Sequence, residues 1–209
     1  MSQLRDRRRR HDSHYRRAKR ERFVARSVYK LEEIEQRFTL FHPGQHVLDL
    51  GCRPGSWLQF AGARVGPTGK LVGLDRQPLD VELGSNVRIE IGNVLEIDPA
   101  ILLGDLQHFD VVMSDMAPDT SGVAFSDQVR SIELFERALE IALATGKQGS
   151  AFVGKVFMGE GFSEAVRRIK AHYKRSKTVR PQATRKSSTE VYVVALDKKT
   201  VPSAHSPSS

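Results

Sequence analysis

The chain has 209 residues, a single cysteine and a formal net charge of +8. A chain of this length is expected to form one domain with a real hydrophobic core, and a single cysteine excludes a disulfide framework and a cysteine-rich metal site. No apolar run reaches membrane-spanning length, and no apolar segment follows the charged N-terminus. We therefore expect a cytoplasmic protein without a signal peptide, a membrane anchor or a bound metal.

The positive charge is concentrated in two segments of the chain. Residues 1–22 contain ten Lys and Arg against three Asp and Glu, and residues 167–186 contain nine against none. The intervening residues 23–166 contain twelve basic and twenty acidic side chains. Such clustering is typical of a surface that binds a polyanion, because phosphate contacts release condensed counterions. We expect a nucleic acid as partner, and the alternative is a solvated helix face together with a disordered arm.

The N-terminal region is expected to consist of an arm and a helix. Residues 1–14 are arginine-rich and have almost nothing to bury, so we expect a disordered arm. From about Tyr15 to about Arg37 the pattern is helical. The apolar stripe of this helix consists of Val24, Val28, Leu31 and Phe38. Lys30 lies beside the stripe, and its spacing alone indicates an ordinary lysine at the rim of a helix.

Residues 46–57 predict a cofactor site. An apolar run typical of a buried strand leads into a turn with Gly51 and Gly55, and Ser56 can then cap a helix. Glycine lets a ligand approach the backbone, and a helix start offers unpaired N–H groups. The turn lacks the G-x-G-x-x-G spacing of dinucleotide sites, and Asp49 would attract a sulfonium or an ammonium. These features favour S-adenosylmethionine over NAD, and an ordinary strand-to-helix turn is the alternative.

The next two strands end in residues suited to a nucleoside. Residues 70–75 read as a strand that ends at Asp75, about twenty residues after the glycine turn. A carboxylate at this place can accept hydrogen bonds from both ribose hydroxyls. Residues 87–91 alternate as a strand and lead to Asn93, whose side chain can bond the edge of an adenine. Asparagine is also a common turn residue, so a purely structural role stays open.

Residues 110–115 predict a further strand that brings a side chain to the ligand-binding edge of the sheet. This apolar strand delivers Asp115 to its C-terminal end, where open α/β sheets bind ligands. We expect the loop over residues 116–122 to hold a substrate beside Asp115. A long amphipathic helix is then expected from about Asp127 to about Gly146. Its inward-facing residues are expected to be Val129, Ile132, Phe135, Leu139 and Leu143.

Lys155 stands inside the apolar strand over residues 150–157. Because burying an unpaired ammonium is costly, packing alone rarely places a lysine there. Either its head group reaches solvent, or it lies at the ligand edge beside an acid such as Asp115. We favour the second interpretation.

The C-terminal third predicts a basic helix and a hairpin. The helix begins at Phe162 and ends near Tyr173, and a short strand follows over residues 177–180. A closing strand over residues 190–196 opens with a carboxylate, and the short connection favours antiparallel pairing. Residues 199–209 are expected to form a loose tail.

Five segments together resemble the FtsJ/RrmJ family of S-adenosylmethionine-dependent RNA ribose 2′-O-methyltransferases. The segments are residues 25–34, 49–57, 114–118, 155–157 with 159–162, and 188–192. The resemblance implies an α/β, Rossmann-like class I methyltransferase fold. Its mostly parallel seven-stranded sheet would carry an antiparallel terminal hairpin and helices on both faces, in a single domain over residues 15–198.

The resemblance also implies the site residues. The family's catalytic Lys-Asp-Lys-Glu tetrad falls on Lys30, Asp115, Lys155 and Glu190. The residues implied to contact S-adenosylmethionine are Gly55, Trp57, Asp75, Asn93 and Asp115. The chain departs from the family pattern at Arg53 and Ser56, where a small residue and a glycine are usual, and at Asn93, where aspartate is common. None of these departures affects the tetrad.

We therefore expect an enzyme that transfers a methyl group from S-adenosylmethionine to a ribose 2′-hydroxyl of RNA. Lys155 would act as the base or would steer the hydroxyl. The implied substrate is a uridine in large-subunit, 23S-type ribosomal RNA, and the partner is this RNA or the large subunit, with no obligate protein partner and a monomeric state. The alternatives are a transfer RNA ribose 2′-O-methyltransferase, a non-catalytic RNA-binding assembly factor, and a nicotinamide-dependent oxidoreductase. The intact tetrad disfavours the second, and the missing glycine fingerprint disfavours the third.

Overall fold

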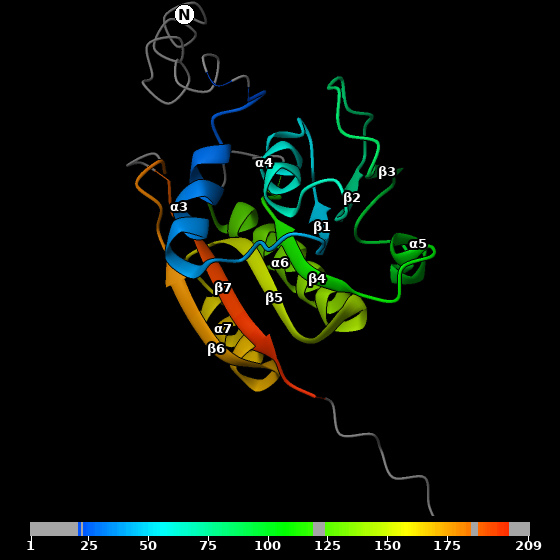
Figure 1. Cartoon of the computed structure of the whole chain (residues 1–209). Helices are drawn as coiled ribbons and strands as arrows, with labels where there is room; N and C mark the ends of the chain where they lie inside the picture. The colour runs from blue at the N-terminus through cyan, green and yellow to red at the C-terminus, as the bar shows by residue number, and fades with distance from the viewer. Residues whose placement is uncertain (1–20, 22, 119–123, 185–187, 201–209) are drawn as a thin grey trace, which may run out of the picture.

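A seven-stranded sheet with the strand order β3-β2-β1-β4-β5-β7-β6 forms the centre of the protein (Figure 1). The computed structural model describes residues 21, 23–118, 124–184 and 188–200. The expected arm over residues 1–14, and all of the expected tail except residues 199 and 200, lie outside this part of the chain.

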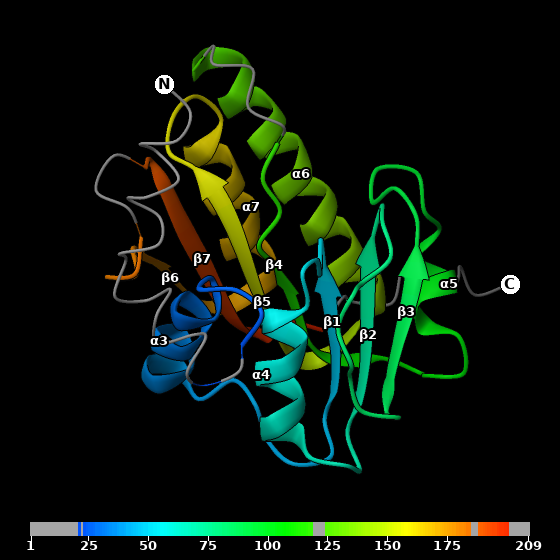
Figure 2. The same ribbon diagram turned by 90° about the horizontal axis from the view of Figure 1, so that it is seen from above.

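The sheet is parallel from β3 to β5 and antiparallel at its other end. Its strands are β1 (His46–Leu50), β2 (Lys70–Asp75), β3 (Val87–Ile91), β4 (Phe109–Ser114), β5 (Gly146–Phe157), β6 (Tyr173–Val179) and β7 (Glu190–Lys198). Strand β7 lies between β5 and β6 and is antiparallel to both. Since β7 runs opposite to β5, its first residue lies at the edge where the parallel strands end (Figure 2). The expected sheet and terminal hairpin are confirmed.

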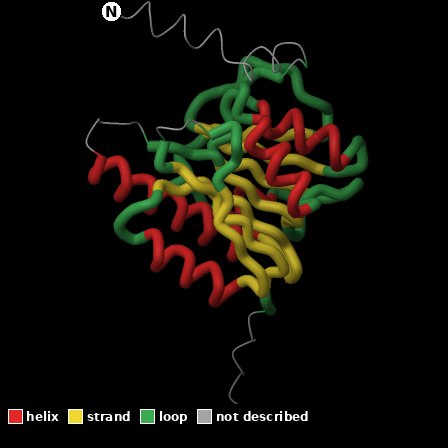
Figure 3. Tube along the Cα trace, turned by 90° about the vertical axis from the view of Figure 1, so that its left-hand side faces the viewer, coloured by secondary structure: helices red, strands yellow, loops and turns green. Residues whose placement is uncertain are grey.

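Helices cover both faces of this sheet, as expected (Figure 3). They are α3 (Val28–Phe38), α4 (Ser56–Val65), α5 (Pro99–Leu103), α6 (Ala124–Thr145) and α7 (Phe162–His172). Alternate residues of a strand belong to two different hydrophobic cores, because side chains along a strand point to opposite faces of the sheet. Val47 of β1 joins the core under α3 and α4, whereas Leu48 joins the core under α5, α6 and α7.

Two helix predictions need correction. The N-terminal helix begins at Val28, and Val24 is 44% exposed and outside the apolar stripe; Tyr15 lies outside the described residues. Val129 was expected to face inward but is 49% exposed. The buried side of this part of α6 is formed by Asp127 and Ser131, and Ser131 accepts a hydrogen bond from the N–H of Phe157 at the end of β5. Val129 lies two residues from each of them and therefore on the other side of the helix. Figure 2 shows that the first turns of α6 extend beyond the ends of the central strands.

The last strands also start earlier than the pattern predicts. Strand β5 begins at Gly146, directly after α6, and β6 begins at Tyr173, directly after α7. Strand β6 is at the edge of the sheet and pairs with β7 alone, so residues 174–178 are exposed or half-buried. A polar edge strand lacks the apolar alternation by which its start could be recognised.

Candidate active site

The sheet brings four distant side chains to the edge where its parallel strands end. Asp115 directly follows β4, and Lys155 lies two residues before the end of β5. Glu190 is the first residue of β7 and is paired in register with Phe157. Lys30 comes from the first turn of α3. The structure thus brings together all members of the expected tetrad.

Lys155 and Asp115 form the more buried of two ion pairs. The Nζ atom of Lys155 lies 3.1 Å from Oδ1 of Asp115 and donates a hydrogen bond of 2.5 Å to the Asp115 backbone carbonyl. The side chain of Lys155 is 7% exposed, and that of Asp115 is 19% exposed. The lysine therefore ends at the ligand edge beside a carboxylate and does not extend into solvent.

The second ion pair joins α3 to β7. The Nζ atom of Lys30 lies 2.6 Å from Oε1 of Glu190, and both side chains are largely buried. The same Nζ atom is 5.7 Å from the ring centroid of Tyr192. Lys30 is thus held by a carboxylate and an aromatic face, whereas its spacing in the sequence had indicated an ordinary rim lysine.

Tyr192 connects the two pairs, and sequence analysis did not single it out. Its hydroxyl donates a hydrogen bond to Oδ1 of Asp115, and its residue pairs with Lys155 across β5 and β7. Burial, followed by the charges of Asp115 and Glu190, raises the pKa of Tyr192, so its hydroxyl stays protonated and acts as a donor. The available signal was the period of a strand, since Tyr192 follows Glu190 by two residues and shares its face.

A cavity of about 470 Å³ opens beside this cluster. Three expected cofactor residues line it, namely Asp75, Asn93 and Asp115. Gly51 also lines the cavity and has φ +74°, a conformation that favours glycine. A Cβ atom there would clash with Cγ of Met116, another lining residue. The glycine is therefore required for this wall of the cavity.

Gly55 and Trp57 lie elsewhere and are not among the lining residues. Gly55 has φ +106°, and a Cβ atom there would lie 2.7 Å from Cγ1 of Val81. Trp57 is buried, with its ring centroid 5.9 Å from that of Tyr192. Its indole N–H donates to the Ser27 carbonyl at 3.0 Å, which ties α4 to the start of α3. In this structure Trp57 packs against Tyr192 and does not line the cavity.

Asp75 and Asn93 line the cavity while holding local turns. The carboxylate of Asp75 accepts hydrogen bonds from the backbone N–H groups of Arg53, at 3.0 Å, and Gln77, at 3.1 Å. A carboxylate offers about four acceptor sites, so Asp75 can still accept from a ligand. The Oδ1 atom of Asn93 accepts from the N–H of Leu95 at 3.2 Å. The turn role of Asn93 is observed, Asn93 also lines the cavity, and its hydrogen bond to an adenine stays a prediction.

A ligand with a positive centre suits the charge around the turn. Asp49 is buried, and its Oδ2 atom has no hydrogen-bond partner within the described part of the chain. Burial raises the pKa of Asp49, and the charges of Asp115 and Asp75 raise it further. The negative charges of Asp115 and Asp75, which line the cavity, therefore disfavour the ionised form of Asp49 behind it, and a cation bound in the cavity would offset this negative charge.

Among the described residues we find neither a metal site nor a membrane-spanning helix. No group of three or more His, Cys, Asp or Glu side chains among them is arranged to hold a metal ion. No helix in the same part of the chain is long and apolar enough to cross a membrane.

The fold and the site define the class of the protein. A mostly parallel sheet with a glycine turn after β1, and a lysine-carboxylate cluster beside the cavity, define a Rossmann-like methyltransferase. Residues 23–198 match the model of the FtsJ-like methyltransferase family, and the chain belongs to this family. Membership confirms the resemblance and the expected methyl-transferring enzyme, and it gives no support to a nicotinamide-dependent oxidoreductase.

Several bacterial relatives are similar over most of their length. The chain is 44% identical over 177 residues to ribosomal RNA large subunit methyltransferase E of Desulfatibacillum aliphaticivorans, covering 85% of this chain and 86% of that protein. It is 45% identical over 188 residues to the protein of the same name from Desulfosudis oleivorans, and the match covers 90% of this chain and 91% of that protein. A ribosomal RNA methyltransferase of Plasmodium falciparum shares the fold, with a TM-score of 0.74, 22% identity and coverage of 84% and 98%.

Proposed function

We propose that this protein transfers the methyl group of S-adenosylmethionine to a ribose 2′-hydroxyl of RNA, specifically to a uridine in large-subunit ribosomal RNA. The observation that carries the proposal is the convergence of Lys30, Glu190, Lys155 and Asp115 beside one cavity. The names of the bacterial relatives support ribosomal RNA as the substrate. A cytoplasmic, monomeric enzyme would suit this role.

The cavity suits the proposed methyl donor. When bound, S-adenosylmethionine supplies a methyl carbon that its sulfonium has already activated. Asp75 would accept the ribose hydroxyls of the donor, and Asn93 and Leu95 would border its adenine. Asp115 lines the cavity, and its carboxylate would stabilise the positive charge of the donor.

The chain's own residues would orient the acceptor hydroxyl and remove its proton. Lys155 is held by both the carbonyl and the carboxylate of Asp115, so its amine has a fixed position beside this cavity-lining residue. In the neutral form this amine can take the hydroxyl proton onto Nζ, and in the charged form it can hold the hydroxyl oxygen in line. The Lys30–Glu190 pair would fix the other side of the ribose.

RNA binding would depend on only part of the basic surface. On α7, Arg167 is paired with Glu164, and Arg168 is paired with Glu136 and lies near Glu140. Two lysines of the edge strand, Lys174 and Lys177, are exposed and are better placed to bind phosphates. We propose that this strand and the arm over residues 1–20 contact the RNA backbone.

A transfer assay with tritiated S-adenosylmethionine tests the proposal. Large ribosomal subunits without 2′-O-methylation, naked 23S-type RNA and transfer RNA would each be offered, with Lys155→Ala as the inactive control. We expect label in ribosomal RNA, retained in an alkali-resistant dinucleotide because a 2′-O-methyl group blocks cleavage. Label only in transfer RNA would support that alternative substrate. No transfer to any RNA, although the cofactor binds, would support the non-catalytic assembly factor.

A further inference from the structure

The wall of the cavity between β3 and α5 is an irregular segment that needs outside support. Asn93, Val94 and Leu95 line the cavity, and all three follow β3 directly after Gly92. The hydrogen bonds within the segment are local, such as those from the N–H groups of Glu96 and Ile97 to the Asn93 carbonyl. A turn of this kind can move as a unit unless another element holds it.

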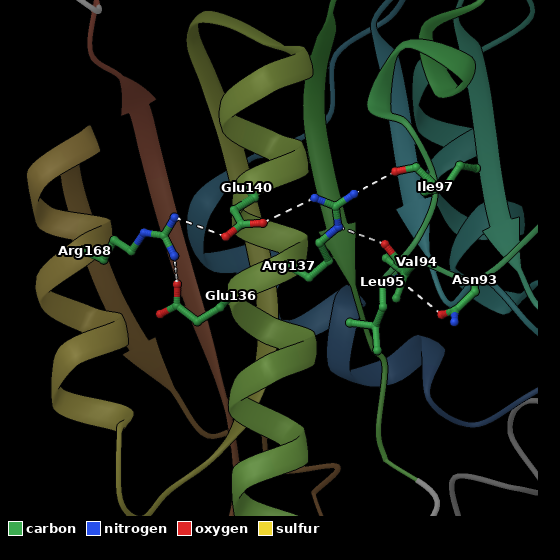
Figure 4. Close-up of polar contacts among 8 residues, drawn as sticks. All are labelled: Asn93, Val94, Leu95, Ile97, Glu136, Arg137, Glu140 and Arg168. Carbon is green, nitrogen blue, oxygen red and sulfur yellow. Dashed lines mark hydrogen bonds and ion pairs between the residues drawn. The ribbon is translucent and has the colours of Figure 1, made fainter.

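Arg137 of α6 holds this turn at both ends (Figure 4). Its Nε atom donates to the carbonyl of Val94 at 3.0 Å, and its Nη2 atom donates to the carbonyl of Ile97 at 2.7 Å. The guanidinium is a rigid, planar fork, so one side chain fixes two carbonyls at a set spacing. Neither lysine nor glutamine presents donors with this separation.

Arg137 is also in contact with a wider network of charged side chains on α6 and α7. Glu140 lies one turn further along α6, and its Oε2 atom accepts from Nη1 of Arg137 at 3.3 Å. Arg168 of α7 approaches Oε1 of Glu140 at 3.5 Å and is also paired with Glu136. Figure 4 shows these groups as one continuous chain of contacts from α7 through α6 to the turn. Arg137 is 22% exposed and is not among the residues that line the cavity.

We infer that Arg137 is a positioning residue that shapes the adenosine end of the methyl-donor cavity. This inference rests on the proposed function. By fixing the carbonyls of Val94 and Ile97, Arg137 holds Asn93 and Leu95 against the cavity before the donor arrives. A pre-formed wall improves affinity because less conformational freedom is lost on binding.

The test compares the affinities of two ligands for Arg137→Gln and the wild type. S-adenosylhomocysteine contains both ends of the donor, and methylthioadenosine contains only the nucleoside end. We expect both dissociation constants to rise by the same factor, about tenfold, because two charge-assisted hydrogen bonds to the turn are lost. The kcat at saturating S-adenosylmethionine and the KM for RNA should stay near wild type. Arg137→Lys keeps the charge and one donor direction, so its dissociation constants should lie between those of the wild type and those of Arg137→Gln.

Arg168→Gln is the matched control because it removes an arginine from the same network without touching the turn. It should lower thermal stability but leave both dissociation constants within about twofold of wild type. Unchanged affinities in Arg137→Gln, or an equal loss in Arg168→Gln, would overturn the inference. If Arg137→Gln does not fold, Arg137→Lys decides in the same way. Failure of the wild type to bind S-adenosylhomocysteine would instead reject the proposed function.

Discussion

The hydroxyl of Tyr192 donates to Oδ1 of Asp115, the same oxygen that lies 3.1 Å from Nζ of Lys155. The ring of Tyr192 also lies 5.7 Å from Nζ of Lys30. One fully buried side chain therefore contacts both ion pairs of the site. The position of Asp115 is set by a neutral donor as well as by a lysine, so the two pairs are coupled through the tyrosine.

Removing the Tyr192 hydroxyl should lower the rate of methyl transfer. In Tyr192→Phe the ring still packs against Trp57, so we expect a folded protein with unchanged affinity for S-adenosylhomocysteine. We expect kcat to fall about tenfold, because a hydrogen bond to a charged group contributes about 1.5–3 kcal/mol and only part of it acts on the reaction. Tyr173→Phe is the matched control, since the buried Tyr173 hydroxyl has no hydrogen-bond partner among the described residues. Equal kcat in the two variants would contradict the role of Tyr192.

Replacing Lys155 tests the proposed chemistry directly. We expect Lys155→Ala and Lys155→Arg to lose about a hundredfold or more in kcat, because neither places a titratable amine beside Asp115. Single-turnover transfer of labelled methyl to RNA measures this loss. Lys70 is exposed and lies at the start of β2, whereas the site lies where the parallel strands end. Lys70→Ala should therefore leave the rate unchanged. Activity near wild type in either Lys155 variant removes this residue from the reaction.

The central strands and the glycine turn could be predicted because they are buried on both faces. The four buried residues of β1 from Val47 to Leu50 include one charged side chain, Asp49, and its isolation among apolar residues marks the site. Lys155 was recognisable for the same reason, since a charge inside an apolar strand needs a partner. Edge strand β6 could not be placed equally well, because exposure removes its apolar period. At the start of α6 the buried positions are the polar residues Asp127 and Ser131, so the apolar pattern pointed to the wrong face there.

Contacts between distant residues carried no comparable signal. Lys30 looked like a surface lysine until the family resemblance placed it in the tetrad, because its partner Glu190 is brought close only by the antiparallel strand β7. Arg137 was missed because it binds backbone carbonyls of Val94 and Ile97, and a carbonyl leaves no mark in the sequence. Such roles depend on tertiary packing and not on local pattern.

Asp110 should make the stability of the protein depend on acid pH. Burial alone would raise its pKa, but hydrogen bonds from Lys147 and from the N–H of His46, at 2.7 Å, outweigh burial and lower the pKa below the ordinary value of 3.8. The unfolded chain therefore binds more protons between the two pKa values, so the stabilisation is complete above about pH 4 and is lost as pH falls through the folded pKa.

Urea unfolding of Asp110→Asn and wild type at several pH values measures this contribution. We expect the variant to be less stable by about 1 kcal/mol at pH 7, because it keeps an acceptor for His46 but loses the charge that Lys147 binds. The difference should shrink as the pH falls below about 4. Glu164→Gln is a control, since its partner Arg167 is highly exposed and little loss is expected. A difference independent of pH would show that Asp110 acts through packing and not through its charge.

The arm over residues 1–20 should supply much of the salt-sensitive affinity for RNA. It contains nine Lys and Arg against two Asp, and deletion after residue 20 keeps Glu21, whose carboxylate accepts a hydrogen bond of 3.0 Å from Tyr29. Each phosphate contact contributes roughly 0.7 to 0.9 to the slope of log K against log salt, so we expect weaker binding and a slope smaller by several units. Titrations with labelled RNA at increasing salt measure the slope, and S-adenosylhomocysteine binding serves as the control, since the arm should not affect it. An unchanged salt slope would show that the RNA-binding charges lie elsewhere, with Lys174 and Lys177 of β6 as the next candidates.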